Sequence, residues 1–324
     1  MLRMGKEETA LILSVSPHIK SRESVQRIMG AVIVTLLPAV GYSIYQFGVH
    51  ALLMYLVSIA TCIVSEWVAV RLRKRPFSLR DGSAVVTGIL LAMVLPPKFP
   101  LYGVILGAVV SILIGKQIFG GIGYNIFNPA LIGRAFLAAT YPVFISSYVL
   151  PRAAVDAVSQ ATPLAAMKFE GIMTSYGALF FGRIGGSLGE TSAFLLILGA
   201  IFLIVKRYIK WRIPLSIFVT VAVLGEIFHL INPAQYPDPL FHLLTGGLMI
   251  GSLYMATDMV TSPITNRGCV IFGCGIGCLV VFIRLLGGLP EGVMYAILFM
   301  NAFVPLINKA TKPRILGTGG RDEH

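Results

Sequence analysis

The amino-acid sequence predicts an all-α polytopic membrane protein. Of its 324 residues, 56% are hydrophobic and 12% are charged, whereas soluble domains are about 45–50% apolar and about 25% charged. Stretches of about 20 apolar residues, the length that crosses a bilayer as a helix, recur along the chain between polar segments. This apolar surface requires lipid as its solvent and excludes a soluble globular enzyme.

About ten transmembrane helices are expected from the hydropathy of successive segments. The third and the eighth of these are the short ones. The ten segments cover approximately residues 28–47, 50–70, 82–96, 99–117, 124–141, 191–207, 213–232, 239–257, 267–287 and 289–308.

The positions of Lys and Arg predict the orientation of these helices, because short cytoplasmic loops carry the excess of positive charge. With the N-terminus inside, twenty of the 26 basic residues fall in inward loops and termini. The outward connections hold only Lys98, Arg152, Lys168 and Arg183. We therefore expect both termini to be cytoplasmic. The formal charge of +12 reflects this topology, and no nucleic-acid partner is expected.

The two halves of the chain resemble each other. TGILLAMVLPP (Thr87–Pro97) and TGGLMIGSLYMATDMVTSP (Thr245–Pro263) each combine small residues, a short apolar helix and a break marked by proline. Five spans per half is an odd number, so the second half would insert upside down, as in proteins with two inverted five-helix repeats. The alternative is that Gly and Pro are simply frequent in membrane helices.

These segments predict five regions in the chain. The longest stretch outside the membrane contains apolar runs such as YGALFFG (Tyr176–Gly182) between Pro, Gly and Ser, which predicts a folded cap on the outer face. The regions are a cytoplasmic N-terminal segment (1–27), a first half (28–141), an outer loop (142–190), a second half (191–308) and a cytoplasmic tail (309–324).

The outer loop contains the sequence DAVSQATPL, from Asp156 to Leu164. Because Pro163 holds the preceding residue extended, the hydroxyl of Thr162 is predicted to be exposed on a turn near Ser159 and Asp156. Ser, Thr and Pro gather in most loops, so the local sequence alone indicates little about function.

The pattern D-x-x-S-x-A-T at Asp156–Thr162 resembles the signature on which a flavin transferase links a threonine hydroxyl to flavin mononucleotide (FMN). Four further stretches resemble the family of D subunits of the Rnf electron transport complex, to which the B subunit of the sodium-pumping NADH:quinone reductase is related. These stretches are Ser16–Ala39, Asp81–Pro97, Phe127–Phe136 and Met255–Pro263.

This resemblance implies that Thr162 carries FMN through a phosphoester and that Asp156 and Ser159 belong to the flavin transferase motif. It implies a subunit of a complex in a prokaryotic cell (inner) membrane, which transfers electrons between reduced ferredoxin and NAD⁺ and moves Na⁺ or H⁺. The flavin would lie on the outer face. The implied partners are the other membrane and peripheral subunits, the flavin transferase and the lipid bilayer. A second, non-covalent flavin such as riboflavin would lie between the halves.

Basic residues of the outer loop are candidate partners of the flavin phosphate, since ion pairs with phosphate are strong. Arg152, Lys168 and Arg183 are these candidates, with anchoring of the loop at the membrane interface as the alternative. Arg134, within the fifth segment, is expected to pair with a backbone carbonyl, a carboxylate or a cofactor group.

Acidic residues near the spans are candidates for an ion pathway, because charge at membrane depth usually faces a cavity or a partner. Glu226 lies in the seventh segment, and Asp258 follows the eighth, where a hydrogen bond at the helix end is the alternative role. Cys274 and Cys278 lie among glycines, which favours close helix packing over a metal site.

Two other classes of protein remain open at this point. An inverted five-plus-five repeat is also the architecture of a channel or secondary transporter without a redox cofactor. A structural scaffold is the other alternative, because Gln160 occupies a position where the flavin signature usually has glycine. Flavin on Thr162 would distinguish a redox protein from both.

Overall fold

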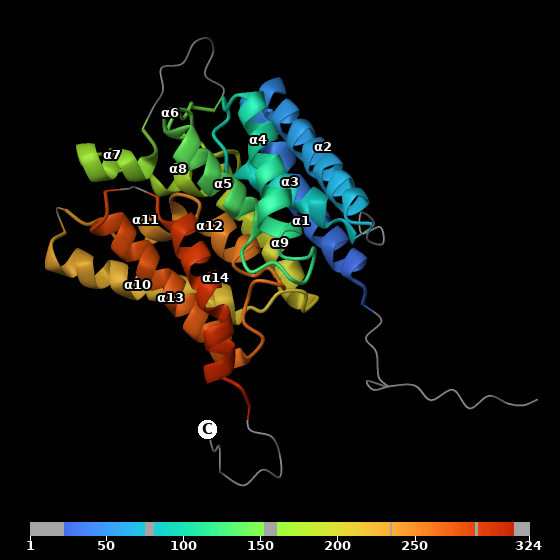
Figure 1. Cartoon of the computed structure of the whole chain (residues 1–324). Coiled ribbons are helices and arrows are strands. Elements are labelled where there is room, and N and C mark those ends of the chain that lie inside the picture. Colours follow the sequence, from blue (N-terminus) through green and yellow to red (C-terminus); the bar gives the residue numbers. More distant parts are fainter. Residues whose placement is uncertain (1–22, 75–80, 152–160, 234, 289–290, 314–324) are drawn as a thin grey trace, which may run out of the picture.

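The computed structural model describes residues 23–74, 81–151, 161–233, 235–288 and 291–313. The regular elements in these ranges are all helices (Figure 1), which confirms the prediction of an all-helical membrane protein. Five of them are long and apolar enough to cross a membrane. These are α1 (Val25–Phe47), α2 (Val49–Leu72), α10 (Arg212–Ile231), α13 (Asn266–Leu285) and α14 (Val293–Ala310).

Shorter apolar helices occupy most of the remaining predicted segments. They are α3 (Ser83–Met93), α4 (Leu101–Ile112) with its π-helical continuation η2 (Leu113–Gln117), α5 (Pro129–Thr140) and α9 (Ala193–Val205). The eighth predicted segment is broken into α11 (Pro239–Leu244), α12 (Leu248–Ile250) and the π-helical η4 (Gly251–Met255). Gly246, with φ of +65°, supplies the left-handed turn at the break.

The predicted outer loop is folded where the structure describes it. Its elements are α6 (Pro142–Ile145), α7 (Pro163–Glu170), α8 (Tyr176–Phe181) and the 3₁₀ turn η3 (Leu188–Glu190). Leu164, Leu179 and Ile184 form a small apolar cluster with Phe241 of α11. The loop therefore packs as a cap on the second half of the chain.

Polar side chains determine where several helices begin. Ser24 accepts a hydrogen bond from the backbone N–H of Arg27 at the start of α1. Asn128 caps α5 and Thr162 caps α7, and each is followed by proline at the first helical position. A side-chain acceptor followed by proline is a strong helix start, because the acceptor satisfies a free N–H and proline has the helical φ.

The outward surface of the long helices is apolar. Val34 of α1, Leu56 of α2 and Val223 of α10 are more than half exposed. In water such a surface would aggregate, whereas in a bilayer it faces the acyl chains. Several polar residues of these helices, such as Glu66 of α2 and Asn301 of α14, are instead buried inside the bundle.

Glycine allows neighbouring helices to approach closely within each half. A Cβ atom at Gly133 of α5 would lie 1.9 Å from the Ser111 hydroxyl and 2.6 Å from the carbonyl oxygen of Gly107, both on α4. Gly273 of α13 faces Ser216 of α10 in the same way, at 1.9 Å. Close packing of small residues therefore holds these helix pairs together, as the sequence around Cys274 indicates.

The two halves meet along several elements. Helix α9 packs on α1, and α14 packs on α5. The turn η3 lies between α3 and α12, where the backbone N–H of Leu188 donates to the carbonyl oxygen of Leu95 at 3.0 Å. In Figure 1, α6, α7 and α8 lie together at the upper left, while the start of α1 and the end of α14 lie toward the lower side.

Along the chain the helices follow one another as α1–α5, α6–η3 and α9–α14, and the division into five regions stays a prediction. Residues 1–22 and 314–324, which form most of the predicted cytoplasmic ends, lie outside the described residues.

Gly133→Ala should lower the thermal stability of the purified chain, because the added methyl group collides with the Ser111 hydroxyl and with backbone on α4. Overpacking of this kind costs about 1–3 kcal/mol. Gly41→Ala is the matched control, since a Cβ atom at Gly41 meets nothing within 4 Å. The measurement is the melting temperature in detergent. Equal melting temperatures for the two variants would contradict the packing described above.

Candidate functional site

An outer pocket lies beneath the start of α7. Its empty space, which includes solvent at the open mouth, is about 840 Å³. The walls come from α5, α7, α14 and the segments next to them. The lining residues are Arg134, Ala138, Ile145, Ser146, Tyr148, Ala161, Thr162, Ala165, Gly247, Glu291, Val293, Met294 and Tyr295.

Thr162 is the residue that joins this pocket to the sequence motif. Its backbone is extended, with φ of −64° and ψ of 157°, as Pro163 requires. Its hydroxyl oxygen accepts a hydrogen bond from the N–H of Ala165 at 3.2 Å. The prediction that this hydroxyl is exposed is wrong, since Thr162 is only 3% exposed. The reason is the apolar cluster around Leu164, which holds α7 against the molecule.

An ion pair between the two halves forms one wall of the outer pocket. Arg134 of α5 donates to the carboxylate of Glu291, just before α14, at 2.6 Å. The hydroxyl of Tyr148 donates to the other carboxylate oxygen at 3.3 Å. Of the three partners expected for Arg134, the structure therefore shows a carboxylate. Sequence reasoning missed Glu291 and Tyr148, because they are more than 140 residues apart in the chain.

Further buried polar groups adjoin this wall. Arg284 of α13 donates to the carbonyl oxygens of His242 at 2.6 Å and Thr245 at 2.8 Å, and so satisfies the broken end of α11. Glu190 of η3 is also buried and lies within electrostatic range of Arg134 and Arg284. No role was predicted for Glu190 from the sequence. The signal that could have revealed one is an acidic residue within the glycine-rich run GGSLGE.

The candidate phosphate partners are dispersed. Lys168 donates to the carbonyl oxygens of Arg284 and Gly287, which places its positive charge at the C-terminal end of α13. Burial lowers the pKa of its ammonium group. Arg183 is exposed just after α8. Arg152, with the motif residues Asp156 and Ser159, lies outside the described residues.

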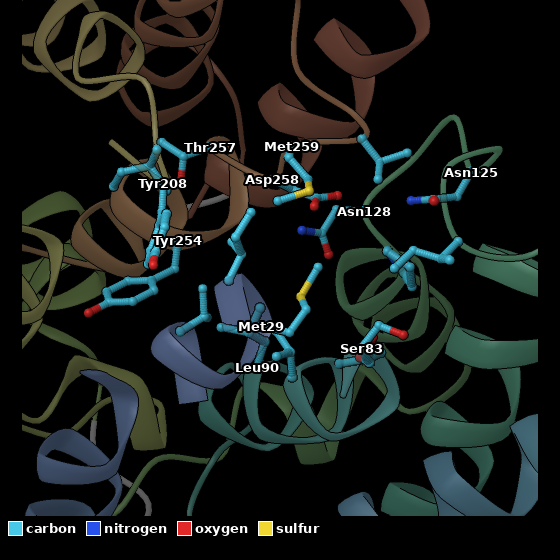
Figure 2. A pocket seen from close by; sticks show the side chains of 18 of the residues that line it. Met29, Ser83, Leu90, Asn125, Asn128, Tyr208, Tyr254, Thr257, Asp258 and Met259 are labelled. Atoms are coloured by element: carbon cyan, nitrogen blue, oxygen red, sulfur yellow. The ribbon is translucent and has the colours of Figure 1, made fainter. Parts of the chain in front are cut away.

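An inner pocket lies between the two halves (Figure 2), and its empty space, solvent at the mouth included, is about 770 Å³. Helices α1 and α3, the segment before α5, the end of α9 and the segment after η4 contribute its walls. Figure 2 shows the amide of Asn128 and the carboxylate of Asp258 on one side, with Met29 and Leu90 opposite and Tyr254 at one end. The pocket is therefore mostly apolar, with a few polar groups.

Charged groups in the wall of the inner pocket are paired. The ammonium group of Lys116 donates to the carboxylate of Glu66 at 2.6 Å and to the hydroxyl of Ser83. Asp258 lines the pocket and accepts a hydrogen bond from the Thr261 hydroxyl at 3.2 Å, which is the helix-end contact considered above.

Glu226, the other predicted ion-pathway residue, is exposed on α10 and lines neither of these pockets. The structure therefore does not bring Glu226 and Asp258 together, and an ion pathway through these two residues stays a prediction.

The apolar outer surface and the helices define a polytopic membrane protein, with two pockets that residues from both halves of the chain line. The chain belongs to the NQR2, RnfD, RnfE family, whose model matches residues 12–317.

Curated relatives cover nearly the whole chain. The D subunit of a proton-translocating ferredoxin:NAD(+) oxidoreductase complex from Clostridium ljungdahlii is 45% identical over 317 residues, which is 94% of this chain and 96% of the relative. The D subunit of a Na(+)-translocating ferredoxin:NAD(+) oxidoreductase complex from Acetobacterium woodii is 42% identical over 315 residues, 96% of each chain. The D subunit of an ion-translocating oxidoreductase complex from Stutzerimonas stutzeri is 39% identical over 93% of this chain and 94% of the relative.

Arg134→Met should destabilise the chain strongly, because it leaves the largely buried Glu291 carboxylate without its ion pair. Removing one partner of a buried pair costs about 3–5 kcal/mol. The double variant Arg134→Met with Glu291→Leu should recover much of that loss, since no uncompensated charge remains. Thermal unfolding in detergent is measured for Arg134→Met, for Glu291→Leu and for the double variant. Purely additive losses would show that the pair is not coupled, and Glu226→Gln is the control for an exposed carboxylate.

Proposed function

We propose that this chain is the D subunit of a proton- or Na⁺-translocating ferredoxin:NAD⁺ oxidoreductase, the Rnf complex, and that it carries FMN on Thr162 in the outer pocket. Family membership and full-length relatives at 39–45% identity support the first part. The observation that carries the second is the placement of Thr162 in the lining of the outer pocket, together with Arg134, Tyr148 and Tyr295. The flavin relays electrons within the complex.

The position of Thr162 suits a phosphoester. Its side-chain oxygen is already at the N-terminal end of α7, where it accepts from Ala165. A phosphate linked to this oxygen would lie at the positive end of the helix dipole, which favours anions. Lys168 would not be needed for this role, because its ammonium group caps α13 instead.

The outer pocket suits the isoalloxazine ring. Its lining is largely apolar, with the aromatic rings of Tyr148 and Tyr295 and the Arg134–Glu291 pair as polar groups. Bound there, the ring supplies reversible electron transfer. The Arg134 guanidinium provides a fixed positive charge near the pocket, where a charge acts strongly because water is largely excluded.

The burial of Thr162 implies an order of maturation. A flavin transferase needs access to the hydroxyl, and in the folded chain this side chain is 3% exposed. Modification at the motif that contains Asp156 and Ser159 therefore precedes the packing of α7 over the pocket. After that step the apolar cluster holds the cofactor in place.

The inner pocket is the candidate site for a second, non-covalent flavin such as riboflavin. It has mostly apolar walls for a flat ring, with Asn128, Tyr208 and Tyr254 among its lining residues. Such a combination of apolar walls and a few directed polar groups is typical of cofactor sites. The two pockets have no lining residue in common, so each flavin would have its own site.

The helices support an arrangement of ten membrane segments in two inverted repeats, with cytoplasmic termini and the flavin loop on the outer face. Each of the ten predicted segments overlaps at least one helix. Helices α3 and α12 both contact the turn η3. Residues of α3 and of η4 line the inner pocket. With the ten segments arranged in this way in a bacterial membrane, Asp258 in the wall of the inner pocket is the candidate contact for a transported ion.

Thr162→Ala should abolish covalent flavin attachment, since it removes the oxygen that forms the ester. The measurement is mass spectrometry of the outer-loop peptide together with in-gel flavin fluorescence, from chain coexpressed with its flavin transferase. Thr174→Ala, in the same loop, is the control and should retain both signals. Unmodified Thr162 in the wild-type chain would remove the redox assignment and favour a channel or a scaffold.

Val86→Trp should reduce the amount of flavin released from the denatured chain to less than a tenth, because the indole fills the inner pocket that Val86 lines. Val85→Trp is the matched control on the same helix, since Val85 does not line that pocket. Melting temperatures in detergent equal to that of the wild-type chain would show that both variants fold. If Val86→Trp leaves the released flavin unchanged, the inner pocket is not its site.

A further inference from the structure

A glycine-rich segment places Glu190 deep between the two halves. Gly182 has φ of +72°, and a Cβ atom there would lie 1.2 Å from the carbonyl oxygen of Thr191, so the chain folds tightly on itself. A Cβ atom at Gly189 would lie 2.8 Å from the side chain of Ile250 and 2.9 Å from the carbonyl oxygen of Met93. The turn η3 is thus wedged between α3 and α12, which determines where the Glu190 side chain lies.

The carboxyl group of Glu190 is poorly solvated. Glu190 is 8% exposed, and one carboxyl oxygen accepts a hydrogen bond from the Ser187 hydroxyl at 2.8 Å. The other oxygen is buried and has no hydrogen-bond partner among the described residues. It packs on Gly186, where a Cβ atom would lie 2.7 Å from it. A buried carboxylate with so few donors is costly, whereas the protonated acid is much less so.

Charged groups face Glu190 from each side. Arg134 of α5 and Arg284 of α13 favour its ionised form, and the carboxylate of Glu291 before α14 opposes it. The ionised form of Tyr148, after α6, would also oppose it. Burial first, and then Glu291, raise the pKa of Glu190 to about 8, against the lowering effects of Ser187 and the two arginines.

The link to the outer pocket is the Arg134–Glu291 pair. Both residues line that pocket, and both interact electrostatically with Glu190. Charge that appears in the pocket is therefore felt at Glu190 across a water-poor interior, where an interaction between charges several ångströms apart remains strong. Glu190 has no other evident role, since it forms no ion pair of its own among the described residues.

We propose that Glu190 is a proton-binding site linked to the redox state of the flavin in the outer pocket. The proposal rests on the proposed function, because it requires FMN on Thr162. An electron, supplied by reduced ferredoxin through the complex or by an electrode, adds one negative charge to the ring. One proton from water converts the Glu190 carboxylate to the carboxylic acid. On reoxidation the electron leaves for the next carrier, the O–H bond breaks, and the proton returns to water.

The midpoint potential of the covalent flavin tests this linkage. Full-length chain carrying Val86→Trp, so that the inner pocket holds no second flavin, is coexpressed with flavin transferase and titrated by spectroelectrochemistry between pH 6 and 9.5. At pH 6 the Glu190 carboxyl is protonated, so Glu190→Gln should leave the potential unchanged. Above pH 8 the ionised carboxylate opposes the added electron, so the potential of the chain with Glu190 should fall below that of the variant.

Two further variants separate this role from a structural one. Ser187→Ala removes the hydrogen bond that stabilises the carboxylate, so the divergence should begin at a higher pH. Glu170→Gln removes an exposed carboxylate at the end of α7 and should leave the profile unchanged.

Flavin mass on Thr162 is measured first in every sample. Absence of flavin in the chain that keeps Glu190 overturns the proposed function and this proposal with it. If flavin is bound and the midpoint potentials of the chain with Glu190 and of Glu190→Gln do not diverge between pH 6 and 9.5, only the role of Glu190 is overturned. If Glu190→Gln alone loses its flavin, the Ser187→Ala variant is the test instead. A midpoint potential in that variant with the same pH dependence as in the chain that keeps Ser187 likewise overturns the proposal.

Discussion

The structure depends on how short, broken helices are stabilised inside an apolar bundle. Lipid offers no hydrogen bonds, so a helix that ends at membrane depth needs partners from the protein itself. The backbone N–H of Leu188 donates to Leu95 just beyond the end of α3, and Arg284 donates to the carbonyls of His242 and Thr245 at the end of α11. Gly189 makes the first contact possible, because no side chain fits between Met93 and Ile250.

This arrangement of helix ends also determines where the pockets form. Because α3 and the segment α11–η4 do not cross the bundle as uninterrupted helices, space remains between the halves, which residues from both halves line. The charges around this space are largely neutralised in pairs, Arg134 with Glu291 and Lys116 with Glu66. Pairing lowers the cost of burying charge, and it also fixes polar groups near sites that suit flavins.

The two flavin sites differ in how they would retain a cofactor. In the outer pocket a covalent bond to Thr162 and the cap around Leu164 hold the group near the outer face. The inner pocket offers no such covalent anchor, and its mostly apolar walls would hold a ligand by non-covalent contacts alone.

The sequence by itself determined the membrane environment, the helical segments, the family and the residue that carries the flavin motif, because hydropathy, charge bias and a contiguous motif are local properties. Only the tertiary structure decided that Thr162 is buried, that Lys168 caps α13 and that the eighth segment is broken at Gly246. It also decided that Arg134, Glu291 and Glu190 share one site. These residues come from distant parts of the chain, and contacts of that kind depend on how the two halves pack rather than on any local pattern.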